Sequence, residues 1–355
     1  MRHYSVVAIL MLTLSVTAVK AQIEGESPIE SRSVPPAVVV QGTDVENADL
    51  PLVGESTGYI PPIDFNSYFR PFYARAEALF LQRTNDANPQ TVIQTSGLAA
   101  PVVATGQFGF PMVAGPRILL GKRCDAHTAI EATYFGTQFW RDVNEVHDPD
   151  NLDLPGALAL GANDFRQADV MTASYRSQLH SAEINYVQMC DEFSLLAGFR
   201  YLNWAERFNI RALNDTNLSN YDLNTSNNLF CAQLGARTTW LGRHVQWELI
   251  GKAALCGNSA SQDQRLTDNN NTIVLRDTHS GGSAFSFLGD LNLNALRPIN
   301  QNWQARVGYN LLFITGLALA PDQLDFTASP SSGLRLDRQG GVFLHGINIG
   351  IDARW

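Results

Sequence analysis

Apolar and polar residues alternate with a period of two along ten segments of the chain. In the first, FYARAEALF, the even positions are Phe or Ala and the odd positions include Arg75 and Glu77. This period is typical of a β-strand with one apolar face. Almost no charge interrupts the apolar stripes, and a Lys or Arg facing lipid at mid-membrane would cost roughly 2–4 kcal/mol. The other nine stripes lie at 118–120, 130–134, 182–186, 193–201, 230–240, 245–255, 285–293, 303–313 and 347–355.

The lengths of the connections between these segments distinguish a membrane barrel from a soluble β-sandwich, whose strands would also show alternating apolar and polar residues. Long and short connections follow each other without exception, a rhythm typical of outer loops and periplasmic turns, whereas Greek-key sandwiches do not sort their loops in this way. We expect an all-β fold, an up-and-down antiparallel transmembrane β-barrel of about ten strands over residues 71–355, with both ends periplasmic. The long connections are 84–115, 141–169, 211–225, 258–281 and 320–339, and the short ones are 124–126, 191–192, 242–243 and 297–300.

Five aromatic residues lie beside the short turns, where an interfacial girdle belongs. They are Phe193, Trp240, Trp247, Trp303 and Trp355. The last segment, GINIGIDARW, is predicted to be strand ten and to close the barrel against the strand that begins at Phe72. Trp355 is then the terminal aromatic read by the barrel-assembly machinery, and outer-membrane lipid surrounds the barrel.

The opposite face of each strand should line the lumen, and it holds charges of both signs. The turns predict that Glu183 faces Arg200, that Arg237 is diagonal to Glu248, that Asn294 faces Arg306 and that Asp290 faces Asn310. Buried charges are costly unless paired, so this mixture predicts a narrow, salt-bridged interior. The predicted lumen network comprises Arg75, Glu77, Glu131, Glu183, Arg200, Arg237, Glu248, Lys252, Asp290, Arg306, Asn348 and Asp352.

The N-terminal region predicts export. Arg2 and His3 precede an apolar run at 6–19 and small residues at a cleavage site after Ala21, so residues 1–21 resemble a secretory signal peptide. Residues 22–70 form an acidic linker with proline pairs, and such a composition is typical of a disordered segment. The expected location is the cell outer membrane. A formal net charge of −9 argues against nucleic acid as a partner.

Four cysteines lie in this exported, oxidising setting. Cys231 and Cys256 flank the turn at 242–243 at matching register on the lumen face, which predicts a cross-strand disulfide. Cys124 and Cys190 lie at neighbouring turns, and their pairing stays open because two strands separate them and a bridge needs Cα atoms within about 7 Å.

Several segments resemble a known family. LLAGFRYL at 195–202, NNLFCAQLGAR at 227–237, AIEATYFG at 129–136, GKAAL at 251–255, FLHGINIGIDARW at 343–355 and above all QNWQARVGYNLLFITGLALAPDQLD at 301–325 are similar to the planctomycete-type β-barrel porins called BBP7, themselves similar to Legionella-type major outer-membrane proteins. The resemblance covers nearly everything after Phe72. It implies an outer-membrane barrel of porin type and carries over no catalytic residue. The chain departs from it in Cys231 and Cys256, where small residues such as glycine are usual.

Other functions were weighed against a porin. A structural or surface-display barrel would bind an envelope partner through its outer loops or the N-terminal linker. An outer-membrane hydrolase would need acids and histidines at the outer rim, such as His147 with Asp148 and Asp150, or Asp277 with His279, but polar loop residues explain these equally well. His180 and His345 lie on strands without a serine or acid at a useful register. We expect no enzyme activity, no cofactor and no metal.

Overall fold

The computed structural model describes residues 70–355 except residue 192, and the side chains of 137, 159 and 160 are also left undescribed. The predicted signal peptide and acidic linker therefore lie outside the described residues, apart from Arg70. Strands dominate this part, and none of its helices is long and apolar enough to cross a membrane. The strands are β1 Phe72–Arg83, β2 Thr91–Thr95, β3 Pro101–Ala104, β4 Val113–Arg123, β5 Thr128–Asp153, β6 Ala168–Met189, β7 Phe193–Asn214, β8 Asn217–Leu241, β9 Gln246–Asp268, β10 Ile273–Pro298, β11 Trp303–Leu317 and β12 Gly340–Arg354.

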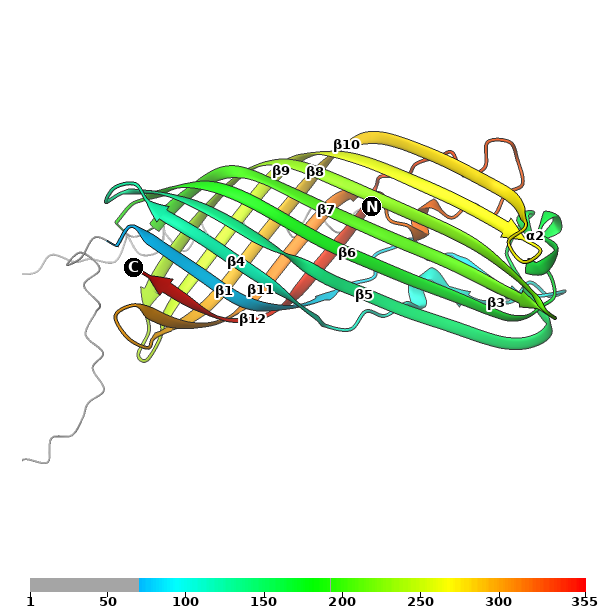
Figure 1. Cartoon of the computed structure of the whole chain (residues 1–355), viewed down its shortest axis with the longest axis horizontal. Helices are drawn as coiled ribbons and strands as arrows, with labels where there is room; N and C mark the ends of the chain where they lie inside the picture. The colour runs from blue at the N-terminus through cyan, green and yellow to red at the C-terminus, as the bar shows by residue number, and fades with distance from the viewer. Residues whose placement is uncertain (1–69, 192) are drawn as a thin grey trace, which may run out of the picture. The chain divides into compact units, whose positions relative to one another are not determined.

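Ten of these strands form a closed ring (Figure 1). The antiparallel order β5-β4-β1-β12-β11-β10-β9-β8-β7-β6 is completed by pairing of β5 with β6. Tyr73 of β1 is the partner of Arg354 of β12, so the last strand closes against the first, as predicted. The predicted up-and-down barrel is confirmed, and β2 and β3 add a short hairpin that joins β5.

Three of the five predicted long loops are wrong, because the strands continue through most of them. β7 and β8 are separated only by residues 215–216, and β9 and β10 only by 269–272. β5 and β6 also extend, so that 154–167 connect them, with α2 Leu158–Gly161 and a 3-10 turn at Asn163–Phe165. In Figure 1 strands β5–β10 run on toward α2, past the ends of β1, β4, β11 and β12.

The reason for these long strands is that the alternation continues but reverses its sense. In the first part of β7 apolar Leu195 and Phe199 are exposed and Arg200 is buried. In the second part Trp204 and Phe208 are buried, whereas Arg207 points outward. Apolar residues face outward where the wall meets lipid and inward where it meets water. The reversal therefore marks the end of the exposed apolar belt on the outer face of the wall.

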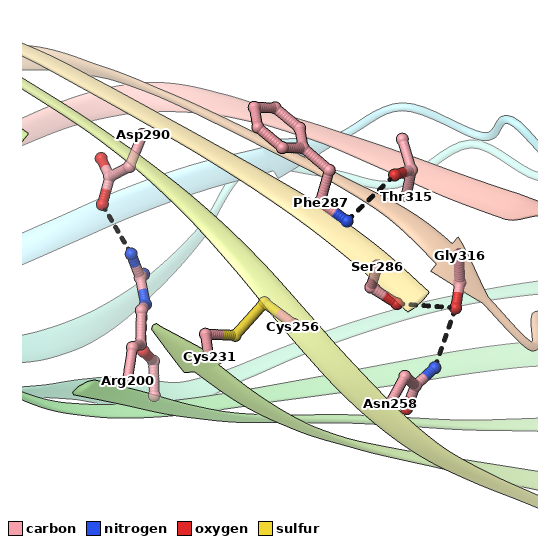
Figure 2. The surroundings of a disulfide bond; sticks show 10 residues. Arg200, Cys231, Cys256, Asn258, Ser286, Phe287, Asp290, Thr315 and Gly316 are labelled. Carbon is pink, nitrogen blue, oxygen red and sulfur yellow. Dashed lines mark hydrogen bonds and ion pairs between the residues drawn. A yellow bond between two sulfur atoms is a disulfide. The ribbon is translucent and has the colours of Figure 1, made fainter. Parts of the chain in front are cut away.

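The segment 318–339, after β11, packs inside the extended wall. A bulge at Gly316, with φ of +75°, ends the β11–β12 ladder, and its carbonyl accepts hydrogen bonds from Asn258 (2.8 Å) and Ser286 (3.0 Å) (Figure 2). Positive φ strongly favours glycine. Asn227 of β8 then donates to the Ala318 carbonyl at 2.9 Å and accepts from the Ala318 amide at 2.8 Å. These contacts turn the chain into the barrel.

The register predicted across the last short turn is wrong by two residues. Asn294 lies opposite Gly308, and Asn292, not Asp290, lies opposite Asn310. The turn is centred one residue later than expected, because the Ile299 and Asn300 amides both bond the Trp303 carbonyl. A two-residue shift keeps each side chain on its face, so lumen residues remain in the lumen but have other partners.

The predicted girdle is visible at the short-turn end. Phe193, Trp240, Trp303 and Trp355 are exposed, and Trp247 is half-buried. Trp355 stacks on Phe72 with ring centroids 6.4 Å apart. Its amide and carbonyl both bond the backbone of Phe72, at 3.0 and 3.1 Å. The barrel seam is thus closed at this end by two hydrogen bonds and an aromatic pair.

Candidate functional site in the barrel lumen

The half of the lumen on the side of the short turns contains a network of ion pairs between arginines and carboxylates. Arg75 lies 3.0 Å from Asp352 across the β1–β12 seam. Arg306 of β11 binds both Glu248 (2.5 Å) and Asp352 (2.9 Å). Each carboxylate therefore faces more than one guanidinium, which favours its charged form and distributes the pairing around the ring.

A second pair crosses the lumen between two strands, β5 and β8, that are not neighbours in the ring. Arg237 of β8 binds Glu131 of β5 through both terminal nitrogens, at 2.9 and 2.8 Å. The Tyr73 hydroxyl donates to the same carboxylate at 2.8 Å. Arg237 is also 3.9 Å from Glu248, the diagonal arrangement that the turn predicted. A bidentate pair fixes orientation as well as charge, so it ties β8 to β5 across the two strands that lie between them.

The middle of the lumen holds a second group of charges. Lys252 binds Glu183 at 2.6 Å, and Gln233 donates to Glu183 at 2.7 Å. Arg200 lies opposite Glu183 in register, as predicted, but its ion pair is with Asp290 at 3.0 Å (Figure 2). Strand register thus places Glu183 opposite Arg200, but Glu183 is bound by Lys252, which reaches it across the lumen from β9.

Glu77 of β1 and Asn348 of β12 are neighbours across the β1–β12 seam. Arg117 of β4 binds Glu77 and donates to Asn292 and Asn310, at 2.9 Å each. Asn348 donates to Glu77 at 2.6 Å. All twelve predicted lumen residues lie on the inner face, and the structure joins them with Arg117 and the asparagines of β10 and β11.

A disulfide lies where the polar network ends. Cys231 of β8 and Cys256 of β9 are strand partners, with Cα atoms 4.0 Å apart, and are bonded to each other. Figure 2 shows them beside the Arg200–Asp290 pair. Both cysteines are buried, and they join the apolar cluster of the outer half. Cys124 and Cys190 are free and exposed at their turns.

Beyond the disulfide the interior is mainly apolar, although it also holds buried polar residues such as Gln264 and Arg276. It contains a buried ion pair. Arg83 of β1 and Glu206 of β7 are 2.8 Å apart, and both side chains have no exposed area. The guanidinium lies over the rings of Phe110, Tyr175 and Trp204, at 4.3, 4.9 and 5.2 Å. This pair was not predicted from the sequence. Arg83 and Glu206 lie just before the segments 84–115 and 211–225 that were expected to be loops, although both residues continue the inner-face parity of their strands.

Two connecting segments complete this apolar layer. Phe108 and Phe110, between β3 and β4, pack edge-on against Tyr175 at 6.0 and 5.1 Å. Leu319 and Leu324, from segment 318–339, belong to the same buried cluster. We call this part of the interior, formed by the inner faces of β5–β10 with 84–112 and 318–339, the outer plug.

Two cavities interrupt the lumen. One of about 30 Å³ lies within the ion-pair network, which is room for one or two water molecules. The other, of about 530 Å³, lies at the short-turn end and is lined in part by the turn at 299–302. The larger cavity has the size of a small-molecule site.

The histidines weighed for catalysis lie on the outer face and not together. His147 contacts Glu145 at 2.9 Å, and His279 contacts Asp263 at 2.7 Å, all four half-exposed or more. His180 bonds the Tyr134 hydroxyl at 2.9 Å. His345 has the same kind of contact with a tyrosine, Tyr309, at 2.8 Å. In the described residues no group of three or more His, Cys, Asp or Glu could hold a metal ion.

Solved structures with a related chain path are outer-membrane barrels of low similarity. The translocator domain of the autotransporter NalP from Neisseria meningitidis has 9% identity and a TM-score of 0.39, with 82% of this chain and 91% of that chain covered. The outer membrane protease OmpT from Escherichia coli has 9% identity and a TM-score of 0.42, covering 80% and 97%. A Pseudomonas aeruginosa FadL homologue has 9% identity and a TM-score of 0.26, covering 80% and 90%. These values are too low to assign a function.

The sequence itself gives a family. No curated protein matches it significantly. The family model described as "Putative beta barrel porin-7 (BBP7)" matches residues 163–355, which are 193 of the 355 residues and include the strands from β6 to β12 complete. The match therefore covers more than half of the chain, and the protein belongs to the BBP7 family of β-barrel porins.

Proposed function

We propose that this protein is a porin-type barrel of the outer membrane whose lumen is narrow, salt-bridged and closed by its own side chains. The observation that carries the proposal is the burial of charged lumen residues. Glu131 is 1% exposed, and Arg200 and Asn348 are 0% exposed. A water-filled pore leaves its polar lining accessible, as in barrels of sixteen or more strands, whereas barrels near eight strands fill with side chains.

The outer face supports the membrane location. Ile349, Phe199 and Leu234 belong to an exposed apolar belt, and the aromatic girdle borders it at the short-turn end. Such a belt is the surface that a barrel presents to lipid. Export through a cleaved signal peptide at 1–21 is part of the same proposal.

Two barriers in series close the lumen, and they differ in chemistry. The ion-pair network must exchange partners before a solute can pass, and the outer plug must move. Ion pairs of opposite sign around the lumen do not select an ion by charge, as a ring of one sign would. We therefore expect rare, small conductance steps and not a stable wide pore.

Single-channel recording of the refolded barrel in planar bilayers tests this proposal. Brief, small steps at raised voltage are the expected result, and heat-modifiable gel mobility checks that the barrel is folded. Stable, large steps at low voltage would show that the lumen is open and would refute the proposal. Flat traces from folded, inserted protein would instead favour the display function described next.

The extended strands favour a second candidate, a barrel that displays a surface to an envelope partner. Above the apolar belt the outer wall of β7–β10 is polar, with cross-strand pairs such as Arg207–Asp222 at 2.6 Å and Arg265–Asp277 at 3.4 Å. Solvent-exposed pairs contribute little to stability. We regard the protein as non-enzymatic, because the His–acid contacts on the outer face, one on β5 and one between β9 and β10, have the form of ordinary surface pairs. Pull-down with the refolded barrel, with loss of capture on reversing these charges, would support display.

A further inference from the structure

The cavity of about 530 Å³ at the short-turn end has an unusual lining, in which arginines outnumber carboxylates by six to two. The lining comes from β1, β4, β6–β12 and the turn at 299–302, so it is part of the lumen and not of the lipid-facing surface. The six arginines are Arg70, Arg75, Arg123, Arg237, Arg306 and Arg354, and the carboxylates are Glu248 and Asp352.

The floor of the cavity is formed by the lining residues that belong to the ion-pair network, among them Arg75, Arg237 and Arg306. Carboxylates that lie deeper in the lumen balance the charge of these arginines. Arg117 and the floor arginines form ion pairs only with the lumen carboxylates described above. Counted with those deeper partners, the floor has four cations and four anions. They are Arg75, Arg117, Arg237 and Arg306 with Glu77, Glu131, Glu248 and Asp352.

The mouth of the cavity therefore holds a surplus of positive charge above a neutral floor, and Arg70 and Arg123 carry it. Arg70 donates to the Gln301 carbonyl at 2.5 Å and to the Asn302 side chain at 2.9 Å, both neutral oxygens. Arg123 is half-buried and forms no ion pair within residues 70–355 as described. Arg354 lies beside them, 3.4 Å from the Gln304 amide oxygen.

Cations gathered in a partly enclosed space repel one another and concentrate anions. Guanidinium groups bind phosphoryl and carboxylate oxygens in pairs, which a single chloride does not match. The cavity volume falls within the range of about 300–1,000 Å³ usual for small ligands. Charge, donor geometry and size thus agree on one class of ligand.

We propose that this cavity is a binding site for a small, soluble polyanion that carries two or more phosphoryl or carboxylate groups. The arginines at the mouth hold its charged groups, and the neutral ion-paired floor limits its depth. This goes beyond the proposed porin function, because binding at the short-turn end needs no passage through the outer plug.

Isothermal titration calorimetry of the full mature chain in detergent micelles tests the site, with pyrophosphate and citrate as separate probes and orthophosphate for comparison. One saturable site is expected for at least one polyanion, with orthophosphate bound at least tenfold more weakly. Arg123→Ala should weaken binding about tenfold, which is roughly 1.4 kcal/mol, and Arg70→Ala with Arg123→Ala should weaken it further. Arg297→Ala is the matched control, because Arg297 is exposed at the same end but does not line the cavity.

Three results would overturn the proposal. The first is no saturable binding of either polyanion to protein whose fold is verified by gel mobility. The second is equal weakening by Arg297→Ala and Arg123→Ala, which would indicate diffuse surface attraction. The third is wild-type affinity in the Arg70→Ala, Arg123→Ala double variant. The flanking carboxylates are unchanged in every variant, and the conductance of the wild-type barrel is a separate measurement that tests the porin function alone.

Discussion

The buried pair Arg83–Glu206 offers a direct test of how the outer plug is held. Glu206 accepts hydrogen bonds from Arg83 (2.8 Å), Tyr175 (2.8 Å), Trp204 (2.9 Å) and the Ala320 amide (2.8 Å). It therefore joins β1, β6 and β7 to segment 318–339. Arg83→Met would keep most of the side-chain volume but leave a buried carboxylate without its counter-charge.

Breaking a buried pair from one side costs about 3–5 kcal/mol, because the remaining charge is uncompensated. We expect this loss for Arg83→Met and a similar one for Glu206→Gln, which leaves the guanidinium unpaired. The double variant should lose less than the sum, by about 2–3 kcal/mol, because contacting residues couple on this scale and no net charge is stranded. The amide oxygen that Glu206→Gln introduces can still accept hydrogen bonds from the other donors.

Denaturant unfolding of the refolded barrel in lipid vesicles, followed by tryptophan fluorescence, measures these losses. The control is Arg207→Met with Asp222→Asn, an outward pair one residue along β7 whose side chains are 52% and 25% exposed. It should cost under about 1 kcal/mol. Strict additivity of the two plug substitutions, or a loss for Arg83→Met no larger than for the control, would refute the reasoning.

Three further predictions concern other parts of the molecule. Burial raises the pKa of Asp322 to about 6. The folded state therefore binds a proton more tightly than the unfolded state, and the stability that this adds below pH 4 is lost as the pH rises through 6. Asp322→Asn should flatten that decline in unfolding midpoints measured from pH 4 to 7, and an unchanged profile would count against it. The disulfide between Cys231 and Cys256 joins residues 25 apart in the sequence, so the variant with Cys231→Ala and Cys256→Ala should lose about 3–4 kcal/mol of unfolding free energy. Intact-mass measurement of the wild-type protein should show two free thiols without reductant and four with it. Four free thiols in both cases would contradict the bond. Removing Trp355 breaks its stack and backbone bonds with Phe72 and should lower the amount of barrel recovered from outer membranes, whereas wild-type amounts would argue against an assembly role.

The barrel itself could be predicted from the sequence, because every strand that faces lipid must carry apolar residues on its outer face and so alternates with a period of two. Alternation identified ten strands, and tight turns gave registers such as Glu183 opposite Arg200. The predicted register was wrong only across the longer turn between β10 and β11. Asn294 and Arg306 flank such a turn, and a centre displaced by one residue moves every partner by two.

The outer plug could not be predicted in the same way, because the apolar residues change from the outer to the inner face of the strands beyond the exposed apolar belt. Asn209 and Arg211 are outward-facing residues of β7, and Arg211 begins the segment 211–225 that was expected to be a loop. The apolar residues that alternate with them, Ile210 and Ala212, are fully buried on the inner face. The sequence therefore continued to alternate, but the position of the reversal is a property of the bilayer and not of any one residue. The contact between Arg83 and Glu206 spans 123 residues and depends on the closed ring.

The two barriers in the lumen are stabilised by different forces, which determines how they can open. The inner network consists of exchangeable charged partners, as when Arg306 binds both Glu248 and Asp352, so it can rearrange without exposing apolar surface. The outer plug cannot move without exposing buried apolar residues, at about 25 cal/mol per Å². The disulfide between Cys231 and Cys256 lies at the border and fixes β8 against β9 there. We therefore expect motion of the plug mainly in the segments 84–112 and 318–339, which lie outside the ring of ten strands. Within 84–112 the β2–β3 hairpin is tied to the wall where β2 pairs with β5, and the wall itself stays closed.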